Sequence, residues 1–393
     1  MTAFIFQLQS DIFNIFWLLI FFFMMFFYPR LLIYQILNRF SKTSQLLDEL
    51  NEKSRKKILS RIKGGKDEEN KIKSFLDFYL ITPVSLDPFG IIKKLEHLIN
   101  QEESKFKYFA DKITKNLNEE EKWSFISALS AQMALHQISK LIKHYIQLIG
   151  KTKSYQLGLI IQMQLPLIEK YSKSLYKAVE AFIDNKPIGD SSGPLLAASM
   201  MKGKVREIDD VVFSVEKINR KKVIVVKAKG PGARIGKLGR AIEKLIKKFK
   251  VEKIITVDAA VKLESERTGD IAEGIGVAIG GIGVEKAIIE DIATKRNIAL
   301  DSYVIKMSQE EALYPMKEEI LESVFEVRKR IEENIKESKE KTIMVVGVGN
   351  TSGIPNSNKL DEVIEKIKKA SKEIKRWEEE EKTKEKEIWS FGI

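Results

Sequence analysis

The sequence contains no cysteine, and its 393 residues include only three histidines. Without cysteine the chain can form no disulfide, no thiolate metal site and no cysteine nucleophile. The histidines, His97, His136 and His144, all fall in a segment of helical apolar spacing. A metal site there would need further ligands, and no Ser-His-Asp arrangement is visible. We therefore interpret the histidines as packed or surface residues.

Basic residues are absent from the first 29 positions, where Asp11 is the one charged side chain. In residues 12–28 every residue but Asn14 is apolar, and a 17-residue run is at the lower limit for crossing a hydrocarbon core of roughly 30 Å. A signal peptide would need a basic start and a small-residue cleavage site, and neither is present. A buried core helix is the other alternative. We expect a transmembrane helix.

The basic residues that follow this run predict its orientation. Arg30, Arg39 and Lys42 come soon after it, with four more in residues 53–57. The positive-inside rule places the N-terminus outside and the rest of the chain in the cytoplasm, so we predict a single-pass protein of the cell membrane. Pro29 is expected to end or kink the helix. The apolar residues of 31–37 would continue along the headgroup surface.

The formal net charge of +12 indicates an anionic partner. Attraction to anionic lipid beside the anchor is worth about 1 kcal/mol per basic residue near the surface. Nucleic acid is the alternative, but no binding motif with interleaved aromatic residues is present. Membrane lipid is therefore the expected partner, and nucleic acid is not.

The composition divides the chain into four predicted segments. These are an anchor and juxtamembrane helix (1–40), a helical domain (41–185), an α/β domain (186–356) and a charged helical tail, solvated or weakly coiled-coil (357–393). A distinct turn-rich stretch at 81–90 precedes the helical bundle. Predicted strands cover 223–228, 253–257, 275–282, 300–307 and 342–348. The expected fold class is α+β, with a transmembrane helix, a helical bundle and a three-layer α/β domain on a mainly parallel sheet.

Three glycine-rich turns fall at predicted strand ends, where open α/β sheets gather ligands. They cover residues 230–236, 274–280 and 347–353. The first is expected to open a helix, so its backbone amides, with Arg234 and Lys237, could hold an anion. It is not a P-loop, because Leu238 replaces the residue that would meet magnesium. The candidate ligand-binding residues are Gly230, Gly232, Arg234, Gly236, Gly347, Gly349 and Asn350. The alternative is that tight turns use glycine for steric reasons alone.

Two aspartates are candidate catalytic residues. Asp190 directly precedes an apolar stretch, and Asp258 lies where the strand 253–257 has run out of apolar residues. A carboxylate at such a place is a catalytic acid or base, a metal ligand or a helix cap. Capping explains the two together less well, because an acidic loop follows Asp258. Its acidic residues are Glu264, Glu266, Asp270 and Glu273.

These motifs resemble the germination protease and hydrogenase-maturation endopeptidase fold. The similar segments are Gly189-Asp190-x-x-Gly193-Pro194 and Val257-Asp258-Ala259-Ala260 followed by a glycine-rich loop. The stretch Gly347-Val348-Gly349-Asn350 resembles a strand end of that fold, in permuted order. The resemblance implies an α/β fold in which Asp190 and Asp258 serve peptide hydrolysis or metal-assisted recognition.

Nearly the whole chain also resembles an uncharacterised family of archaeal membrane proteins. The shared features are Tyr28-Pro29-Arg30 beside the phenylalanine-rich anchor, the segment 82–88 and the stretch 162–167. This resemblance implies no biochemical function.

Three functional hypotheses remain open. The first is a membrane-tethered hydrolase or peptidase-like enzyme that uses Asp190 and Asp258, with or without a divalent metal as its cofactor. The second is a sensor that binds a nucleotide or another phosphorylated small molecule at the turns 230–236 and 347–353. The third is a membrane scaffold whose tail recruits partners. The substrate, the metal and the formation of a homo-oligomer are left open.

Overall fold

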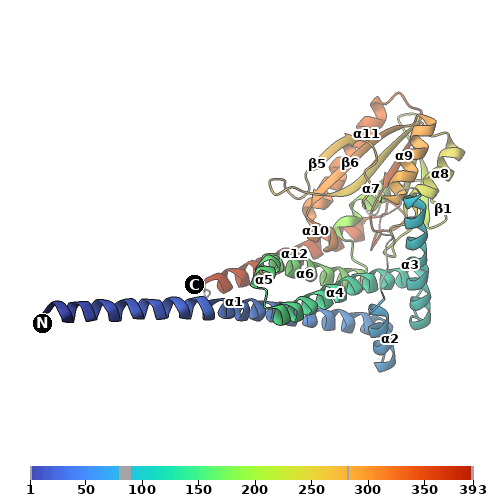
Figure 1. Ribbon diagram of the computed structural model, residues 1–393. Coiled ribbons are helices and arrows are strands. Elements are labelled where there is room, and N and C mark those ends of the chain that lie inside the picture. Colours follow the sequence, from blue (N-terminus) through green and yellow to red (C-terminus); the bar gives the residue numbers. More distant parts are fainter. Residues whose placement is uncertain (1, 79–89, 281–282, 391–393) are drawn as a thin grey trace. The chain divides into compact units, whose positions relative to one another are not determined.

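The computed structural model describes residues 2–78, 90–280 and 283–390 (Figure 1). The turn-rich segment at 81–90 therefore lies outside the described residues, except for Gly90. The chain forms two compact units, Met1–Glu52 with Ala134–Lys173, and Lys53–Met133 with Ser174–Ile393. These limits divide three continuous helices, so they are not the composition boundaries that the sequence suggested. Each unit is described by itself.

The first unit is built on the long helix α1 (Thr2–Ile62), which continues through Pro29. One segment of α1 is long and apolar enough to span a membrane, and the most apolar part of it is not buried against the protein. Burial on α1 begins at Ile33 and includes Ile36 and Phe40. The helices packed against it are the C-terminal part of α4 (Glu119–Thr152), α5 (Tyr155–Gln162) and the first turns of α6 (Leu165–Ile183).

The second unit begins with the remaining helices of the helical region. They are the end of α1, then α2 (Lys66–Leu76), α3 (Ile91–Ile113), and the outer parts of α4 and α6. Residues 91–185 thus contain four helices and no strand in the part that the structure describes, as the helical apolar spacing predicts.

A seven-stranded mixed sheet forms the body of the second unit, in the order β1-β2-β3-β7-β4-β6-β5. The central strands β3, β7, β4 and β6 are mutually parallel, and the strands at both edges are antiparallel. The strands are β1 (Arg206–Ile208), β2 (Val211–Ile218), β3 (Lys221–Ala228), β4 (Lys253–Val261), β5 (Ile271–Ile275), β6 (Ala299–Met307) and β7 (Thr342–Gly347).

Four of the five predicted strands correspond to the central strands, and the fold class is confirmed. The prediction of a strand at 275–282 is wrong over 276–280, because β5 ends at Ile275, and residues 281–282 lie outside the described part of the chain. Gly276 then takes φ +116°, a conformation that turns the chain out of the sheet. β1 and β2 were not predicted.

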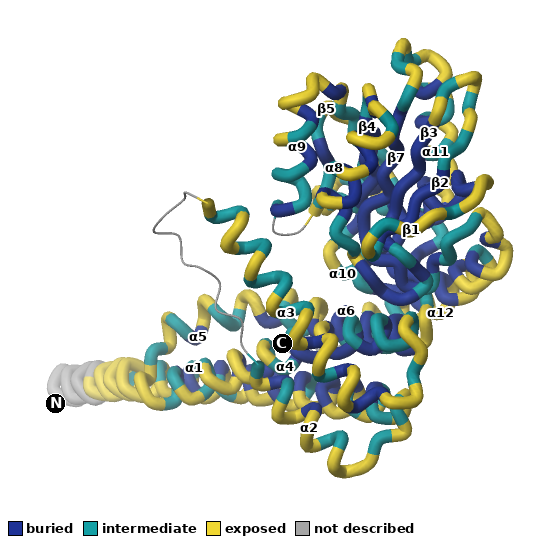
Figure 2. The backbone as a smooth tube through the Cα atoms, turned by 90° about the vertical axis from the view of Figure 1, so that its right-hand side faces the viewer, coloured by how far each residue is buried: buried dark blue, intermediate teal, exposed yellow. Residues whose placement is uncertain are grey.

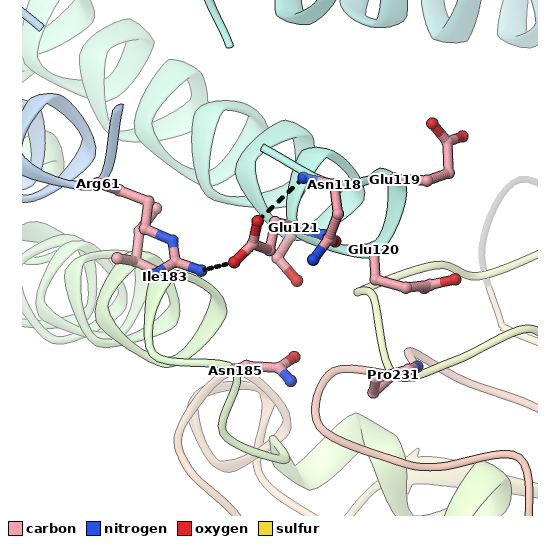
Figure 3. A pocket seen from close by; sticks show the side chains of 9 residues that line it. Arg61, Asn118, Glu119, Glu120, Glu121, Ile183, Asn185 and Pro231 are labelled. Carbon is pink, nitrogen blue, oxygen red and sulfur yellow. Dashed lines mark hydrogen bonds and ion pairs between the residues drawn. The ribbon is translucent and has the colours of Figure 1, made fainter. Parts of the chain in front are cut away.

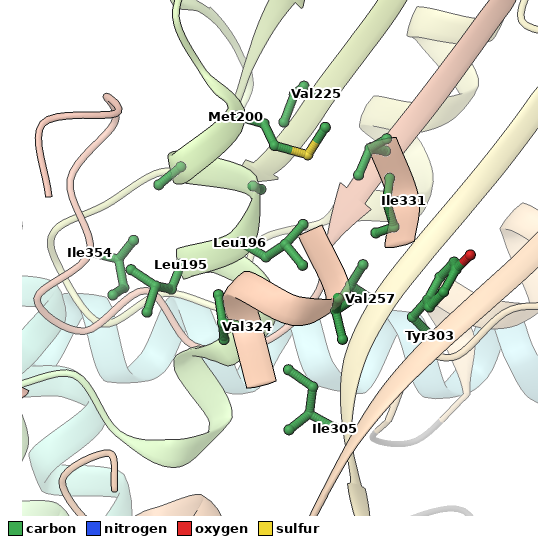
Figure 4. Close-up of a cluster of buried hydrophobic side chains, with 14 of the residues drawn as sticks. Leu195, Leu196, Met200, Val225, Val257, Tyr303, Ile305, Val324, Ile331 and Ile354 are labelled. Atoms are coloured by element: carbon green, nitrogen blue, oxygen red, sulfur yellow. The ribbon is translucent and has the colours of Figure 1, made fainter. Parts of the chain in front are cut away.

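Helices cover both faces of the sheet and complete three layers, because successive strand residues point to opposite faces. One face packs against α7 (Ser192–Met200), α11 (Glu318–Glu337) and α12 (Asp361–Ser390) through residues such as Val225, Val257 and Ile305 (Figure 4). The other face packs against α8 (Leu238–Phe249) and α9 (Val284–Arg296). The short helices η1 (Gly189–Ser191) and α10 (Gln309–Leu313) complete the unit. Strands β3, β4 and β7 are mostly buried (Figure 2), and every residue of α7 is buried.

The charged tail packs on this core, which differs from the solvated helix or coiled coil that its composition predicts. One stripe of α12 is buried, and it consists of Val363, Ile367, Ala370 and Ile374. The ring of Trp377 meets the ring of Tyr314 edge to face, with the centroids 5.5 Å apart. The Ser371 hydroxyl accepts a hydrogen bond from the Glu318 amide. A spacing of four, three and four residues keeps this stripe on one helical face despite the many charges around it.

Candidate functional site

The carboxyl ends of the parallel strands meet at one edge of the sheet, and most of the predicted site residues lie there. The turn 230–236 follows β3, and the turn 347–353 begins as β7 ends. Val257 of β4 is paired with Gly347, the last residue of β7, so Asp258 is the first β4 residue beyond that pairing. Strand β4 continues past β7 and leaves a step in the sheet edge. In open α/β sheets, such an edge is where ligands bind.

Glycines bring η1 and α7 into close contact with this step. A Cβ on Gly193 would lie 2.2 Å from the Val348 carbonyl oxygen, and a Cβ on Gly347 would lie 2.2 Å from the Gly193 oxygen. Gly349 has φ +126°, and a Cβ there would lie 2.0 Å from the backbone carbonyl oxygen of Asp190. Only glycine allows backbones to approach so closely. Gly347 and Gly349, predicted as ligand-binding residues, thus have a packing role that places Asp190 at the strand ends.

Asp190 lies in η1 and is held by the turn after β7. Its Oδ2 accepts a hydrogen bond of 2.8 Å from the Asn350 amide. The Asn350 side chain is engaged within its own turn, where its Oδ1 accepts from the Ser352 amide. Burial raises the pKa of Asp190, and the Asn350 amide only partly opposes this. A charged Asp190 is therefore costly in this position.

Asp258 is 4% exposed and is held by two backbone amides. Its Oδ1 accepts from Ala259 N and its Oδ2 from Gly280 N, both at 2.7 Å. Burial, and then the negative charge of Asp190, raise the pKa of Asp258 to about 7, although both amides act in the opposite direction. The structure therefore brings the two aspartates close enough to repel each other. The turn 274–280 folds over this site and supplies the Gly280 amide.

The turn 230–236 holds an anion, but the anion belongs to the chain itself. Glu120 of α4 accepts hydrogen bonds from Gly232 N at 2.9 Å and from Arg234 Nη2 at 3.1 Å. The Arg234 guanidinium also lies over the Trp123 ring, 5.2 Å from its centroid. Arg234 is 6% exposed, so Glu120 neutralises a buried charge. The Gly230 amide donates to the Asn356 side chain instead.

Helix α8, which this turn was expected to open, begins at Leu238, two residues after the turn ends. The amides at its start donate to two other carboxylates, Lys237 N to Asp210 and Gly239 N to Glu285. Gly236 has φ +73°, and a Cβ there would lie 2.8 Å from the Ala228 Cβ, so its role in the structure is a close turn. In the described chain, the amide donors at 232, 237 and 239 all meet carboxylates of the same chain.

A cavity of about 520 Å³ lies beside this turn (Figure 3). It is lined by Arg61, Asn118, Glu119, Glu120, Glu121, Ser124, Ile183, Asn185 and Pro231. Arg61 and Glu121 form an ion pair of 2.6 Å in its wall. Neither aspartate of the acidic pair lines this cavity, so the two features are separate.

Three acidic residues of the loop after Asp258 are engaged in hydrogen bonds or ion pairs within the same unit. Glu266 accepts from the Leu263 amide, Asp270 from the Arg267 amide, and Glu273 pairs with Arg330. Among the described residues, no group of three or more His, Cys, Asp or Glu side chains is placed to hold a metal ion.

Sequence reasoning missed two charged residues at this edge, Glu120 and Lys227. Lys227 is fully buried near the end of β3, where its Nζ donates to the Asn356 side chain at 2.8 Å and to the Ala228 oxygen. Burial lowers the pKa of Lys227 to about 7. A lysine between Val226 and Ala228 in an otherwise apolar strand was an available signal. No local signal connects Glu120 to a turn more than 100 positions away.

These features define an α/β protein with one buried and one half-buried carboxyl group, Asp258 and Asp190, at the carboxyl edge of a mixed sheet. Two family models match the chain: "Protein of unknown function (DUF1512) N-terminal domain" over residues 14–185, and "Domain of unknown function (DUF1512) C-terminal" over residues 188–355. The chain belongs to this family, and the expected membership of a family of unknown function is confirmed.

Other comparisons add little. No curated protein matches the chain. The crystal structure of the Mycobacterium tuberculosis proteasome-assembly chaperone homologue Rv2125 is similar over 39% of this chain and 82% of its own, with 12% identity and a TM-score of 0.27. A likeness at this level does not bear on function.

Proposed function

We propose that this protein is a membrane-tethered hydrolase that cleaves amide bonds, with Asp190 and Asp258 as its acid–base pair. The observation that carries the proposal is the position of two carboxyl groups that repel each other at the strand ends, where burial raises the pKa of each. Burial and repulsion together disfavour the state in which both carboxyl groups are ionised. One is then a proton donor while the other is a proton acceptor. Their resemblance to the acid motifs of the germination protease and hydrogenase-maturation fold supports the same assignment.

The proposed reaction is hydrolysis by direct attack of water. The ionised carboxylate accepts a proton from water as the water oxygen adds to the substrate carbonyl carbon. The protonated partner donates to the carbonyl oxygen, and the proton taken from water is later passed to the leaving nitrogen. The Asn350, Ala259 and Gly280 amides fix the positions of the two carboxyl groups. The reaction is written here with the two carboxyl groups alone. A peptide is the substrate class.

The same proposal places the enzyme at the inner face of the cell membrane. The apolar part of α1 is exposed, and the basic residues Arg30 and Arg39 follow it while none precedes it. This asymmetry supports an N-terminus outside and an α/β domain in the cytoplasm.

A sensor of phosphorylated ligands is the second candidate, and Glu120 is the observation that favours it. The turn 230–236 already binds one carboxylate through an amide and Arg234. A phosphate group offers more acceptors to the same donors. A scaffold has less support, because its proposed docking element, α12, is packed on the sheet.

The test uses the full chain in proteoliposomes with a library of fluorogenic peptides. We expect Asp190→Asn and Asp258→Asn each to lower kcat/KM by about 10²–10⁴-fold. Asp209→Asn is the matched control, because Asp209 is exposed with φ +54°, a conformation that asparagine tolerates well. Hydrolysis that survives both site variants would refute the acid–base pair. Stabilisation by nucleotide or phosphate that Arg234→Gln removes, without hydrolysis, would establish the sensor instead.

A further inference from the structure

The short helix α5 and the turn after it expose an apolar surface in the first unit. Ile160 is 64% exposed and Met163 is 77% exposed, and three neighbours of the same character share this exposure. These neighbours are Tyr155, Leu159 and Leu167. Contiguous exposed apolar side chains mark a site that contacts a protein or a membrane.

Contacts along α1 place this surface at the end of the unit nearest the apolar segment. The Asn51 amide group contacts the Leu135 oxygen, and Asp48 pairs with Lys143 at 2.6 Å. As the chain advances along α4, its partners on α1 therefore come from earlier positions. The progression ends at α5, where a Cβ on Gly158 would lie 2.8 Å from the Ile36 side chain. The α4–α5–α6 hairpin thus points its tip toward the N-terminal end of α1.

The length of α1 gives the depth of this tip relative to a bilayer. A helix that starts to span at Ile12 crosses a core of roughly 30 Å in about 20 residues, at about Leu31. Ile36 then lies about 7.5 Å beyond the hydrocarbon boundary. The polar layer on each side of the core is about 5–8 Å thick. The contact between α5 and Ile36 therefore falls at headgroup level.

The charge of the segment also fits a lipid surface. Residues 150–163 contain Lys151 and Lys153 but no acidic residue. Lysines beside an apolar surface are typical of helices that lie in the membrane interface, where anionic headgroups attract them.

We propose that α5 and the following turn are a second membrane contact, with Ile160, Met163 and Leu167 inserted among the lipids. The occupant of this surface is the bilayer that holds α1, so the proposal rests on the anchoring proposed above. Two contacts, a spanning helix and an interfacial one, would fix the orientation of the first unit on the membrane.

The absence of cysteine makes the test direct, since each introduced cysteine is the one labelled residue. Ile160→Cys, Met163→Cys and Trp17→Cys are labelled with an environment-sensitive dye in the full chain, in vesicles of phosphatidylcholine and phosphatidylglycerol. Leu141→Cys is the matched control: Leu141 is a 51% exposed apolar residue of the same unit, beside Lys143 and farther from the span. We expect brominated lipids to quench the dye at 160, 163 and 17, with emission shifted to shorter wavelength, and iodide to quench it at 141.

The outcomes separate the two proposals. If the dye at 160 and 163 behaves like that at 141 while position 17 remains quenched by lipid, α5 is not a membrane contact although the anchor is. If brominated lipids fail to quench position 17 as well, the anchor itself is refuted, and α5 loses its basis with it.

Discussion

Replacing Asp258 with asparagine should stabilise the protein at pH 8, because the buried carboxylate costs free energy there. The pKa of Asp258 is raised from its ordinary 3.8 to about 7. In the folded chain the carboxyl group thus holds its proton to higher pH than in the unfolded chain. The free energy of unfolding therefore falls as the pH rises from about 4 to about 7, by up to about 4 kcal/mol.

Asparagine removes this cost at the expense of one hydrogen bond. Both oxygens of Asp258 accept from backbone amides, so the NH₂ group of asparagine must face one of these donors. A lost hydrogen bond of this kind costs about 1–2 kcal/mol. The net gain at pH 8 is about 2 kcal/mol, or a midpoint about 2–3 °C higher for a chain of this length. At pH 5 the Asp258 carboxyl group lowers the free energy of unfolding by only about 1.5 kcal/mol. This is no more than the cost of the lost hydrogen bond, so Asp258→Asn should not stabilise the protein at pH 5.

Thermal unfolding of the full chain in detergent, followed by tryptophan fluorescence at pH 5 and pH 8, measures this difference. Asp209→Asn should leave the midpoint unchanged at both pH values. Asp190→Asn removes the charge that repels Asp258, so the fall in stability should occur at lower pH than in the unsubstituted chain. A midpoint that Asp258→Asn lowers at pH 8, or shifts equally at both pH values, would refute the reasoning.

Two further substitutions test the packing around the site. Gly193→Ala would place a Cβ 2.2 Å from the Val348 carbonyl oxygen, so we expect the free energy of unfolding in denaturant to fall by about 3 kcal/mol or more. The control is Gly150→Ala, where the new Cβ has nothing within 4 Å and should raise the free energy of unfolding by about 0.5 kcal/mol. Glu120→Gln leaves the buried Arg234 without an ionised partner and should cost about 2 kcal/mol, whereas the exposed control Glu119→Gln should cost less than about 0.5 kcal/mol. If a variant and its control changed the free energy of unfolding equally, the packing described here would be contradicted.

Strands β3, β4 and β7 could be predicted from the sequence because each contains a local run rich in β-branched residues between turns. Their order could not, since β7 lies between β3 and β4 although it comes last in the chain. The close approach of Asp190 and Asp258 depends on that order. Both aspartates could therefore be singled out by their motifs, while their repulsion appears only in the folded chain.

The turn 230–236 shows where local motifs mislead. Its glycines and Arg234 indicate an anion site, and the structure does place an anion there. That anion is Glu120, which comes from a helix that the sequence assigns to another domain. The prediction of a solvated or coiled-coil tail is wrong for a related reason. It is based on the overall charge of the segment, and composition averages over both faces of a helix, so it does not reveal the apolar stripe on one face.

The two aspartates at the sheet edge differ from a buried ion pair elsewhere in the same unit. Glu311 and Lys317 form an ion pair of 2.9 Å, and each keeps the other ionised, with the pKa of Glu311 lowered and that of Lys317 raised. In the described part of the chain, neither Asp190 nor Asp258 has such a cation, and burial raises the pKa of both. A group needed only for stability gains nothing from being left unpaired. Unpaired buried carboxyl groups at the carboxyl ends of parallel strands are what a proton-transferring site requires.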